Sequence, residues 1–412
     1  MTSRRASVAA VIAVVYIDML GIGLAYPILP RIIEQFEHGN VSRASYIFGW
    51  LAGLYALMQF IFAPLLGVLS DRYGRRPVIL LALVGMAINY ALLAWAPTLA
   101  WLAIGRMIAG AMGATFSAAG AYLADITPPE KRAQSFGLIG AAFGFGFITG
   151  PVLGGLVGAL DLRYPFLVAG ALSFANFLFC YFVMPESLVH KNRKDFAWSR
   201  ANPIGALREI GRYRSVMSLL IVYLLAMFAS RVSEMTWVLF TAYRFHWSVL
   251  ETNISLAAVG VMFVVGQGGM TRVLVPRLGE RRAILLGLTV SVIGLVLYGV
   301  ITQGWMVYPV MMTGIFGWTV AQPAVQALMS KSVPVNEQGL LQGALASMTN
   351  LTSIGGPVIW TSLFGYFVSP QAPVIIPGAA FFAAAMVFLL ALILARRWLE
   401  HMPATIEQPQ NA

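Results

Sequence analysis

Charged residues are scarce in this sequence. Only 10% of its 412 residues are Asp, Glu, Lys or Arg, whereas a soluble domain has roughly 25%. Hydrophobic residues make up 59%, and the charges cluster between apolar stretches of about twenty residues, each long enough to span a bilayer. This composition excludes a soluble globular protein and predicts an all-α polytopic membrane protein embedded in a lipid bilayer.

Cysteine and patterns of metal ligands are also scarce. The single cysteine, Cys180, excludes an intramolecular disulfide and is expected to be a small buried apolar residue. The sequence has no cluster of metal ligands, no phosphate-binding loop and no nucleophile placed beside a base. We therefore expect no enzymatic activity, no metal and no cofactor. Residues 1–7 lead directly into an apolar stretch, so no cleavable signal peptide is expected.

Hydropathy predicts twelve transmembrane helices, at 8–30, 46–68, 77–97, 100–122, 134–158, 165–184, 215–241, 252–274, 283–302, 305–329, 340–364 and 374–395. Most of the 27 Lys and Arg residues then lie on the side of the membrane that holds both termini. The exceptions are four on the other side and two inside spans: Arg31, Arg43, Arg163, Arg244, Arg106 and Arg231. Because cytoplasmic loops carry an excess of Lys and Arg, both termini are expected in the cytoplasm. The net charge of +11 is thus a topology signal, and no nucleic-acid partner is expected.

The spans divide into two groups of six. Between them lies the basic segment 185–214, which is expected to be a cytoplasmic linker facing anionic headgroups. We predict an N-terminal bundle at 1–184, a C-terminal bundle at 215–396 and a cytoplasmic tail at 397–412. The halves repeat weakly, because Tyr73-Gly74-Arg75-Arg76 recurs as Leu278-Gly279-Glu280-Arg281 and Gly150-Pro151 as Gly356-Pro357. Six-helix repeats of this kind favour an alternating-access transporter with its substrate site near the bilayer midplane.

The sharpest motif lies in the turn between the second and third spans. It reads Gly67-Val-Leu-Ser-Asp71-Arg72-Tyr-Gly74-Arg75-Arg76-Pro77. One carboxylate beside three guanidinium groups can form bidentate ion pairs and bonds to helix ends, so this gating turn is expected to hold a cytoplasmic gate shut in one state. The turn resembles the signature of the major facilitator superfamily, G-x-L-x-D-R-x-G-R-R, and that resemblance implies two six-helix bundles.

A second motif lies in the fifth span, Gly146-Phe-Ile-Thr-Gly150-Pro151-Val-Leu-Gly154-Gly155. Glycines allow close helix contact, and Pro151 removes a backbone donor and bends the helix. The segment is similar to the antiporter motif of drug:proton exporters. Ordinary glycine-rich packing is the alternative.

The resemblance extends along the whole chain to bacterial tetracycline efflux pumps, through Asp18-Met-Leu-Gly-Ile-Gly-Leu, Leu54-Tyr-Ala-Leu-Met-Gln59-Phe and Gly120-Ala-Tyr-Leu-Ala-Asp125-Ile-Thr. It implies roles in drug recognition, gating and proton exchange for Asp18, Gln59, Asp71, Arg75, Arg106, Asp125 and Gln267. The same resemblance marks two departures, because those pumps carry aspartates in helices three and nine where this chain has Asn89 and Ser291.

Two of the 16 acidic residues fall well inside the expected spans, Asp18 and Glu234. A low dielectric favours the protonated form of a carboxyl group, as proton coupling requires. We predict that both couple protons, with Arg106 and Arg231 as counter-charges. The alternatives are a structural Asp18, an Arg106 that reaches the membrane interface, and a permanently neutralised Arg231–Glu234 pair three residues apart on helix seven.

Stranded polar and aromatic residues complete the expected site. A cavity with scattered amides and aromatic walls suits an amphiphilic, planar organic molecule. The substrate-binding candidates are Gln59, Asn89, Phe143, Trp237, Gln267 and Gln326. Helix packing is the alternative for each aromatic residue.

Together these features predict a proton-coupled exporter of a lipophilic cationic or zwitterionic drug-like compound in the bacterial inner membrane, with tetracycline as one candidate. Two alternatives stay open. The chain could export an endogenous metabolite or facilitate its diffusion, or it could be a non-transporting receptor on a transporter scaffold. Nothing in the sequence sets the oligomeric state, and a monomer is compatible with it.

Overall fold

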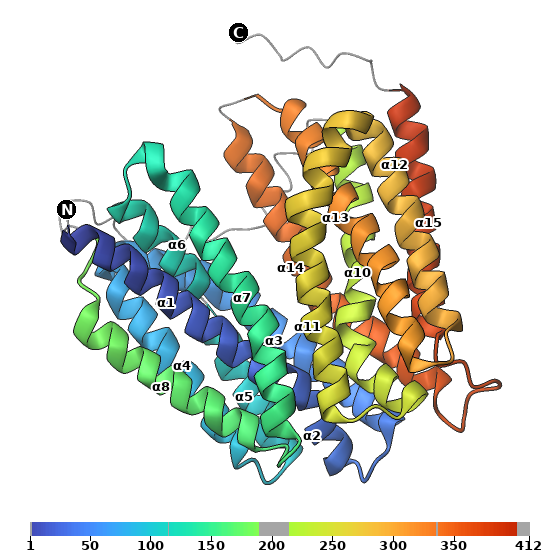
Figure 1. The fold of residues 1–412 in the computed structure, drawn as a ribbon, viewed down its shortest axis with the longest axis horizontal. Helices are drawn as coiled ribbons and strands as arrows, with labels where there is room; N and C mark the ends of the chain where they lie inside the picture. Colours follow the sequence, from blue (N-terminus) through green and yellow to red (C-terminus); the bar gives the residue numbers. More distant parts are fainter. Residues whose placement is uncertain (1, 114, 189–213, 335–336, 402–412) are drawn as a thin grey trace. The chain divides into compact units, whose positions relative to one another are not determined.

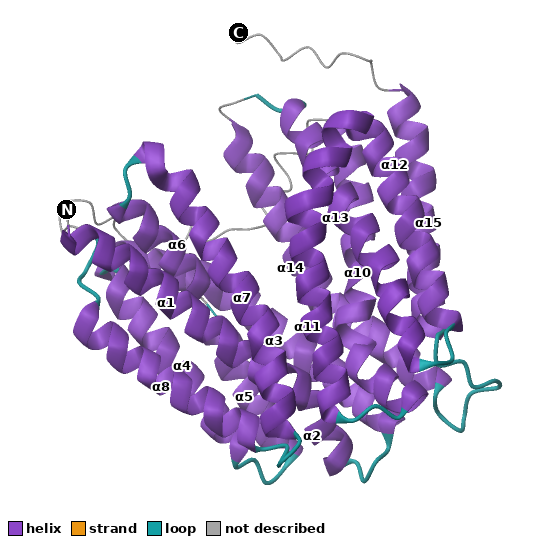
Figure 2. Ribbon diagram, in the orientation of Figure 1, coloured by secondary structure: helices purple, strands orange, loops and turns teal. Residues whose placement is uncertain are grey.

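A computed structural model describes residues 2–113, 115–188, 214–334 and 337–401. These residues form helices and connecting loops, and no strand occurs among them (Figures 1 and 2). The chain divides into two compact units. The first comprises residues 1–40, 50–201 and 248–257, and the second comprises residues 41–49, 202–247 and 258–412.

The helices of the first unit follow the sequence closely. They are α1 (Thr2–Ala25), α2 (Leu29–Phe36), most of α3 (Val41–Tyr73), α4 (Arg75–Ala94), α5 (Leu99–Met112), α6 (Thr115–Ile126), α7 (Arg132–Gly158) and α8 (Tyr164–Val183). Within this unit α1 packs against α7 and α8, and α4 packs against α5 and α8 (Figure 1). Buried side chains of α1, α4 and α6 form its core together with Cys180, which is fully buried as expected.

The second unit contains α10 (Arg214–Phe245), the rest of α11 (Val249–Val265), α12 (Thr271–Val300), α13 (Val307–Lys331), α14 (Gln338–Phe367) and α15 (Ala379–His401). Here α12 packs against α13 and α15, and α10 packs against α14 and α15. A short π-helix, η5 (Gly266–Met270), joins α11 to α12. The helix α12 itself consists of two helical segments that meet at Gly279.

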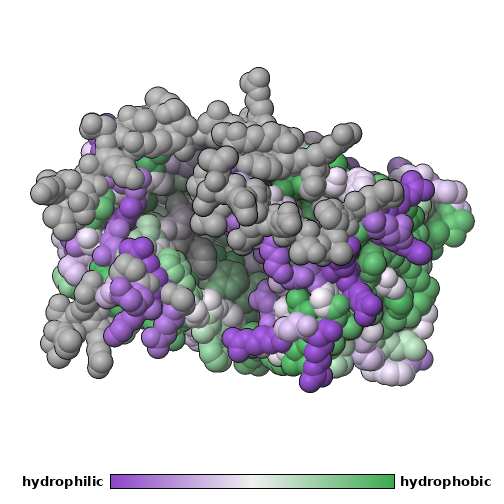
Figure 3. Space-filling view, turned by 90° about the horizontal axis from the view of Figure 1, so that it is seen from above, coloured by the Kyte–Doolittle hydropathy of each residue, from purple (hydrophilic) through white to green (hydrophobic). Residues whose placement is uncertain are grey.

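The prediction of twelve transmembrane helices is confirmed, because each expected span lies mostly on helix. Nine helices among the described residues are long and apolar enough to cross a membrane by length and composition, and α11 is a shorter apolar helix. The helices α13 and α14 coincide with two further expected spans and are 25 and 30 residues long. Within each unit, hydrophilic residues collect at the end seen from above in Figure 3.

The expected division into bundles at 1–184 and 215–396 stays a prediction. Most of the expected linker, residues 189–213, lies outside the described residues, as does the tail from residue 402. The compact units also differ from this division in two short segments. Val41–Gly49 belongs to the second unit, and Ser248–Ala257 belongs to the first.

Candidate functional site

The glycine motif of α7 brings the backbones of α7 and α1 together. A Cβ atom on Gly150 would lie 2.7 Å from the Cα of Gly23, and one on Gly146 would lie 2.7 Å from the Cβ of Met19. Both glycines are buried, and Gly154 and Pro151 continue the same face toward Leu24 and Gly23. The motif therefore fixes the position of α1, the helix that carries Asp18.

Asp18 is the acid of a buried group of polar side chains in the first unit, called here the polar cluster: Asp18 on α1, Tyr55 on α3, Asn89 and Tyr90 on α4, and Arg106 on α5. The guanidinium group of Arg106 donates to the Asn89 Oδ1 at 3.5 Å and lies over the Tyr55 ring, 5.6 Å from its centroid. Tyr90 lies within electrostatic range of both Asp18 and Arg106.

The polar cluster is almost completely withdrawn from solvent. Asn89 is 0% exposed, Asp18 5% and Arg106 8%. Two donors in it, the Nδ2 of Asn89 and the Nε of Arg106, are buried without a hydrogen-bond partner. Buried polar groups without partners are rare in native structures because each costs about 1–3 kcal/mol. The cluster therefore combines a buried carboxyl group with two buried donors that an acceptor oxygen could satisfy.

Two further predicted residues lie on helices of the same unit. Gln59 follows Tyr55 by one turn of α3, and its Nε2 lies 3.0 Å from the position of a Cβ on Gly113, at the end of α5. Phe143 lies on α7, where its ring stacks at 6.3 Å on the ring of Phe147. Gln59 thus adjoins the helices of the polar cluster, whereas Phe143 belongs to an exposed aromatic pair on α7.

The gating turn of residues 67–77 forms an ion-pair network. Arg75 pairs with Asp71 at 2.5 Å and with Asp125 on α6 at 3.2 Å. Its guanidinium group also donates to the hydroxyl of Ser70 at 3.2 Å. The predicted grouping of these charges is thus present within the first unit, and it links the ends of α3, α4 and α6.

Glu186 is the residue that sequence reasoning missed in this network. Its carboxylate accepts hydrogen bonds from the backbone N–H groups of Arg75 and Arg76, at 2.9 and 3.2 Å, and from those of Ser187 and Leu188. An anion at the first turn of α4 is stabilised by the helix dipole and by otherwise unpaired N–H groups. The following hydroxyl, Ser187 Oγ, donates to Asp125 at 3.1 Å.

Gly74 makes this capping possible. Its backbone lies at φ 115° and ψ 161°, a conformation that only glycine adopts readily. A Cβ atom at this position would also lie 2.3 Å from the Glu186 Oε2. Both the backbone and the space therefore require glycine in the gating turn.

The other motif residues have separate contacts. Arg76 donates to the carbonyl oxygen of Tyr181 at 2.5 Å and lies over its ring, while Arg72 lies over the ring of Tyr73. Gly67 is exposed on α3, and a Cβ atom there would meet nothing within 4 Å. The three arginines of the gating turn thus contact different residues and do not share one acidic partner.

In the second unit, Arg231 and Glu234 form the predicted pair. The Nη1 of Arg231 lies 2.6 Å from the Oε2 of Glu234, and its Nη2 donates to Ser353 of α14 at 2.9 Å. The Glu234 side chain is 48% exposed and that of Arg231 is 19% exposed. The pair thus fastens α10 to α14 while leaving one side of the Glu234 carboxylate accessible.

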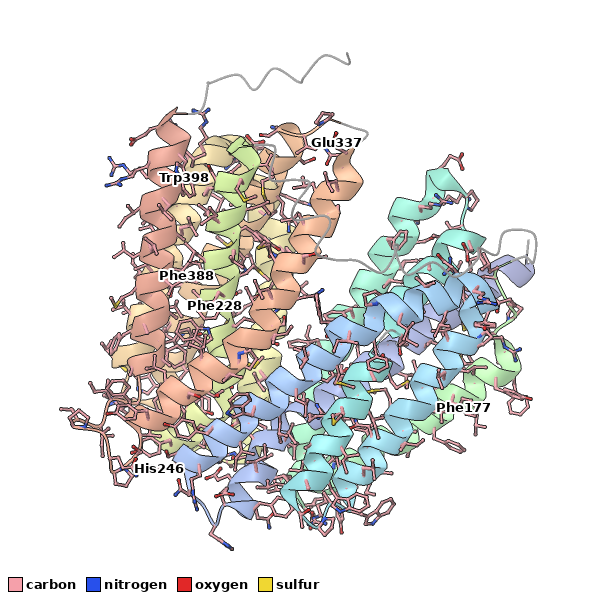
Figure 4. All side chains as sticks on the ribbon, turned by 180° about the vertical axis from the view of Figure 1, so that it is seen from behind. Phe177, Phe228, His246, Glu337, Phe388 and Trp398 are labelled. Atoms are coloured by element: carbon pink, nitrogen blue, oxygen red, sulfur yellow. The ribbon has the colours of Figure 1, made fainter. Side chains whose placement is uncertain are left out.

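Aromatic rings line up near Gln326 in the second unit. Gln326 donates to the Tyr223 hydroxyl at 3.3 Å, Tyr223 contacts the ring of Trp318 at 6.2 Å, and Trp318 contacts Phe388 at 6.0 Å. Phe388 on α15 and Phe228 on α10 are marked in Figure 4. These residues place an amide beside a row of aromatic rings, called here the aromatic wall, in which Tyr223 and Phe388 are buried.

The two other predicted residues of this unit have other surroundings. Trp237 is 3% exposed and packs edge-on against Tyr298 at 5.4 Å. Gln267 lies on the π-helix η5, and its side chain is exposed. Such π-turns occur frequently at functional sites, although nothing in the amino-acid pattern GQGGM distinguishes one from an ordinary helical turn.

A counterpart of the gating turn occurs at the repeat in the second unit. Gly279 lies at φ 75° and ψ 156°, in the same glycine-favouring region as Gly74. Glu280 next to it pairs with Lys331 at the end of α13. The sequence repeat at 73–76 and 278–281 therefore corresponds to a shared backbone conformation.

Sequence reasoning also missed Tyr55, Tyr90 and Ser353. Tyr55 precedes Gln59 by four residues, so it shares a helix face with a residue that was predicted. Tyr90 is the neighbour of Asn89 in sequence. Glu186 carried a weaker signal, since it is the first acidic residue after the sixth span. No group of three or more His, Cys, Asp or Glu residues that could hold a metal occurs in the part of the chain that the structure describes.

Known proteins resemble this chain in both sequence and fold. The profile of the Major Facilitator Superfamily matches residues 11–357 and 273–411. The tetracycline resistance protein of class C from Escherichia coli is 41% identical over 398 residues, covering 96% of this chain and 98% of that protein. The class G protein from Vibrio anguillarum is 38% identical over 394 residues, covering 95% and 98%.

Among solved structures, the nucleoside transporter NupG has a TM-score of 0.80 at 12% identity, covering 98% of this chain and all of the other. That likeness concerns the fold alone. With the helices, the gating turn and the family profile in agreement, the chain is a multi-pass membrane transporter and not an enzyme, and it belongs to the Major Facilitator Superfamily.

Proposed function

We propose that this chain exports tetracycline or a closely similar drug from the bacterial cytoplasm, in exchange for protons that move inward. The observation that carries the proposal is the buried carboxyl group of Asp18 in the polar cluster, 5% exposed. The relatives at 41% and 38% identity that are named for tetracycline resistance support the choice of drug.

The proton step follows from the chemistry of a buried carboxyl group. Deprotonated Asp18 can hold a positively charged group of the drug, and a proton arriving from outside neutralises that carboxylate and releases the drug. Because burial favours the neutral form, proton binding and drug binding compete at one group. Such competition is sufficient to couple the two fluxes in opposite directions.

The second unit supplies a second ionisable group. Glu234 has an accessible carboxylate, and Arg231 holds it at 2.6 Å. We assign to this pair a modulating role, in which a bound cation or proton at Glu234 weakens the ion pair while Arg231 keeps its hydrogen bond to Ser353. The aromatic wall beside Gln326 belongs to the same proposed drug path.

The topology completes the proposal. The protein lies in the inner membrane with both termini in the cytoplasm, as the distribution of Lys and Arg indicates. Two six-helix bundles at 1–184 and 215–396 alternate access around the substrate, and the gating turn stabilises one of the two states. Its partners in this proposal are a small-molecule drug, protons and the lipid bilayer.

The test is uptake of tetracycline into proteoliposomes driven by a pH gradient. We expect the wild type to accumulate the drug, Asp18→Asn to lose gradient-driven uptake, and Glu234→Gln to retain a reduced rate. Glu400→Gln is the matched control, because Glu400 forms an exposed pair with Arg396 at 3.2 Å. Its uptake should equal that of the wild type.

Three results contradict the proposal. Uptake that is indifferent to the pH gradient indicates facilitated diffusion. The absence of any drug flux, with drug binding retained, indicates a receptor. Full gradient-driven uptake in Asp18→Asn removes Asp18 as the coupling residue.

A further inference from the structure

Two hydrogen-bond donors of the polar cluster lack a partner. The Nδ2 of Asn89 and the Nε of Arg106 are both buried without a partner. The two side chains are joined through the Asn89 Oδ1, which accepts from Arg106 at 3.5 Å. A ligand that satisfies both must therefore present acceptor oxygens, such as those of an enolate, a carboxamide or a carboxylate.

The charges of the cluster lead to the same conclusion. Ionised Asp18 contributes one negative charge and Arg106 one positive charge, while Asn89 is neutral. Tyr55, Tyr90 and Tyr26 lie within electrostatic range of the guanidinium group, and Tyr90 also lies within electrostatic range of Asp18. A ligand with both an ammonium group and an anionic oxygen matches this arrangement, whereas a ligand with only positive charge would meet Arg106 unfavourably.

We propose that the polar cluster selects the metal-free zwitterion of its drug, with the acceptor oxygens on Asn89 and Arg106 and the ammonium group on Asp18. This inference rests on the proposed export function and specifies the form of the molecule that is carried. Asn89 becomes a specificity-determining residue, because an acid at its position would favour a metal-chelated cation instead. The neutral amide thereby accounts for one of the two departures from the aspartates of the resembling pumps.

The choice between zwitterion and chelate has an electrical consequence. Exchange of protons for a molecule without net charge moves charge across the membrane, whatever the number of protons. Exchange of one proton for a singly charged metal chelate moves none. A membrane potential should therefore drive transport by this chain even when the pH is equal on both sides.

The first experiment uses the wild-type full chain in proteoliposomes with tetracycline as the probe. The drug is offered free of metal in EDTA or with excess Mg²⁺, and a potential is imposed with valinomycin and a K⁺ gradient at equal pH. We expect uptake in EDTA at least as fast as with Mg²⁺, and uptake that follows the potential. Uptake that needs Mg²⁺ and ignores the potential overturns the inference while leaving proton-driven export intact.

The second experiment changes Asn89. In Asn89→Leu the donor is lost, and we expect the apparent affinity for metal-free tetracycline to fall about 10- to 100-fold, the effect of losing a hydrogen bond to a charged group. In Asn89→Asp the same position repels the oxygens, and the Mg²⁺ form should become the better substrate. An Asn89→Asp variant that keeps the wild-type preference contradicts the inference.

Asn176→Asp is the matched control. Asn176 on α8 is also fully buried in the first unit, and its amide donates to the Val14 carbonyl at 3.0 Å. A carboxylate there can lower the amount of folded protein but should leave the preference between the two forms unchanged. If neither form is transported by the wild type under a pH gradient, the proposed function itself fails.

Discussion

The two glycine turns at 73–76 and 278–281 have similar backbone conformations and different anchoring. In the first unit Gly74 lies under the Glu186 carboxylate, and Arg75 is held by two acids. In the second unit a Cβ atom on Gly279 would meet nothing within 4 Å, and Glu280 pairs with Lys331, which is 55% exposed. The repeat thus keeps the bend of the chain, while the contacts described around the glycine differ between the two units.

The largest expected effect comes from Gly74→Ala. The alanine meets a glycine-only backbone region, which costs about 1–3 kcal/mol, and its Cβ also displaces Glu186. We expect gradient-driven tetracycline uptake in proteoliposomes to fall at least about tenfold at equal protein amounts. Gly279→Ala carries the backbone strain alone and should lose less. Equal losses of uptake in Gly74→Ala and Gly279→Ala would contradict the inference that the Glu186 contact makes the first turn more sensitive than the second.

Glu186→Gln should have the next largest effect. It keeps the shape of the side chain but removes the charge that caps α4, and hydrogen bonds to charged groups contribute about 1.5–3 kcal/mol. We expect the maximal uptake rate to fall about tenfold, with the dissociation constant for tetracycline unchanged. A change in drug binding without a change in rate would refute a positioning role for Glu186.

Asp125→Asn should be milder, because Arg75 retains Asp71 at 2.5 Å. Partly exposed pairs contribute about 0.2–1 kcal/mol each, so uptake should fall about two- to fivefold. The double variant with Asp71→Asn should lose more than the sum of the two single losses in free energy. Strict additivity in this double-mutant cycle would indicate that the two acids act independently.

Lys331→Gln is the smallest change in the series. It removes the ion pair with the Glu280 side chain, and the exposure of Lys331 keeps the contribution below about 1 kcal/mol. Uptake should stay within about twofold of the wild type, and the melting temperature of the purified protein should hardly move. A loss as large as that of Glu186→Gln would show that the second turn also depends on its ion pair.

The sequence was sufficient for the fold and for the members of the gating turn. Apolar length and charge placement are local properties, and the pattern from Gly67 to Pro77 contains its own partners, Asp71 and Arg75. Glu186 could not be found in this way, because it lies 111 residues from Arg75 and bonds to backbone atoms. Backbone N–H groups carry no sequence signal.

The polar cluster illustrates the same limit. The sequence alone identifies Asp18 and Arg106 as charged residues in apolar spans, and Asn89 as an amide in an apolar span. That two of their donors are buried and unpaired depends on how α1, α4 and α5 pack. Only the packing distinguishes a satisfied amide from one that awaits a ligand.

The π-helix at Gly266–Met270 has a consequence for the alignment of this chain with others. A π-turn contains one residue more than an α-turn over nearly the same rise, so it acts as a single-residue insertion within an unbroken helix. Removing one glycine from GQGGM would turn this segment into an ordinary α-turn and would leave the faces of the residues before and after it nearly unchanged. When this segment is aligned residue by residue with an ordinary helix, the alignment is therefore correct on only one side of Gln267. On the other side the residue numbers must be shifted by one.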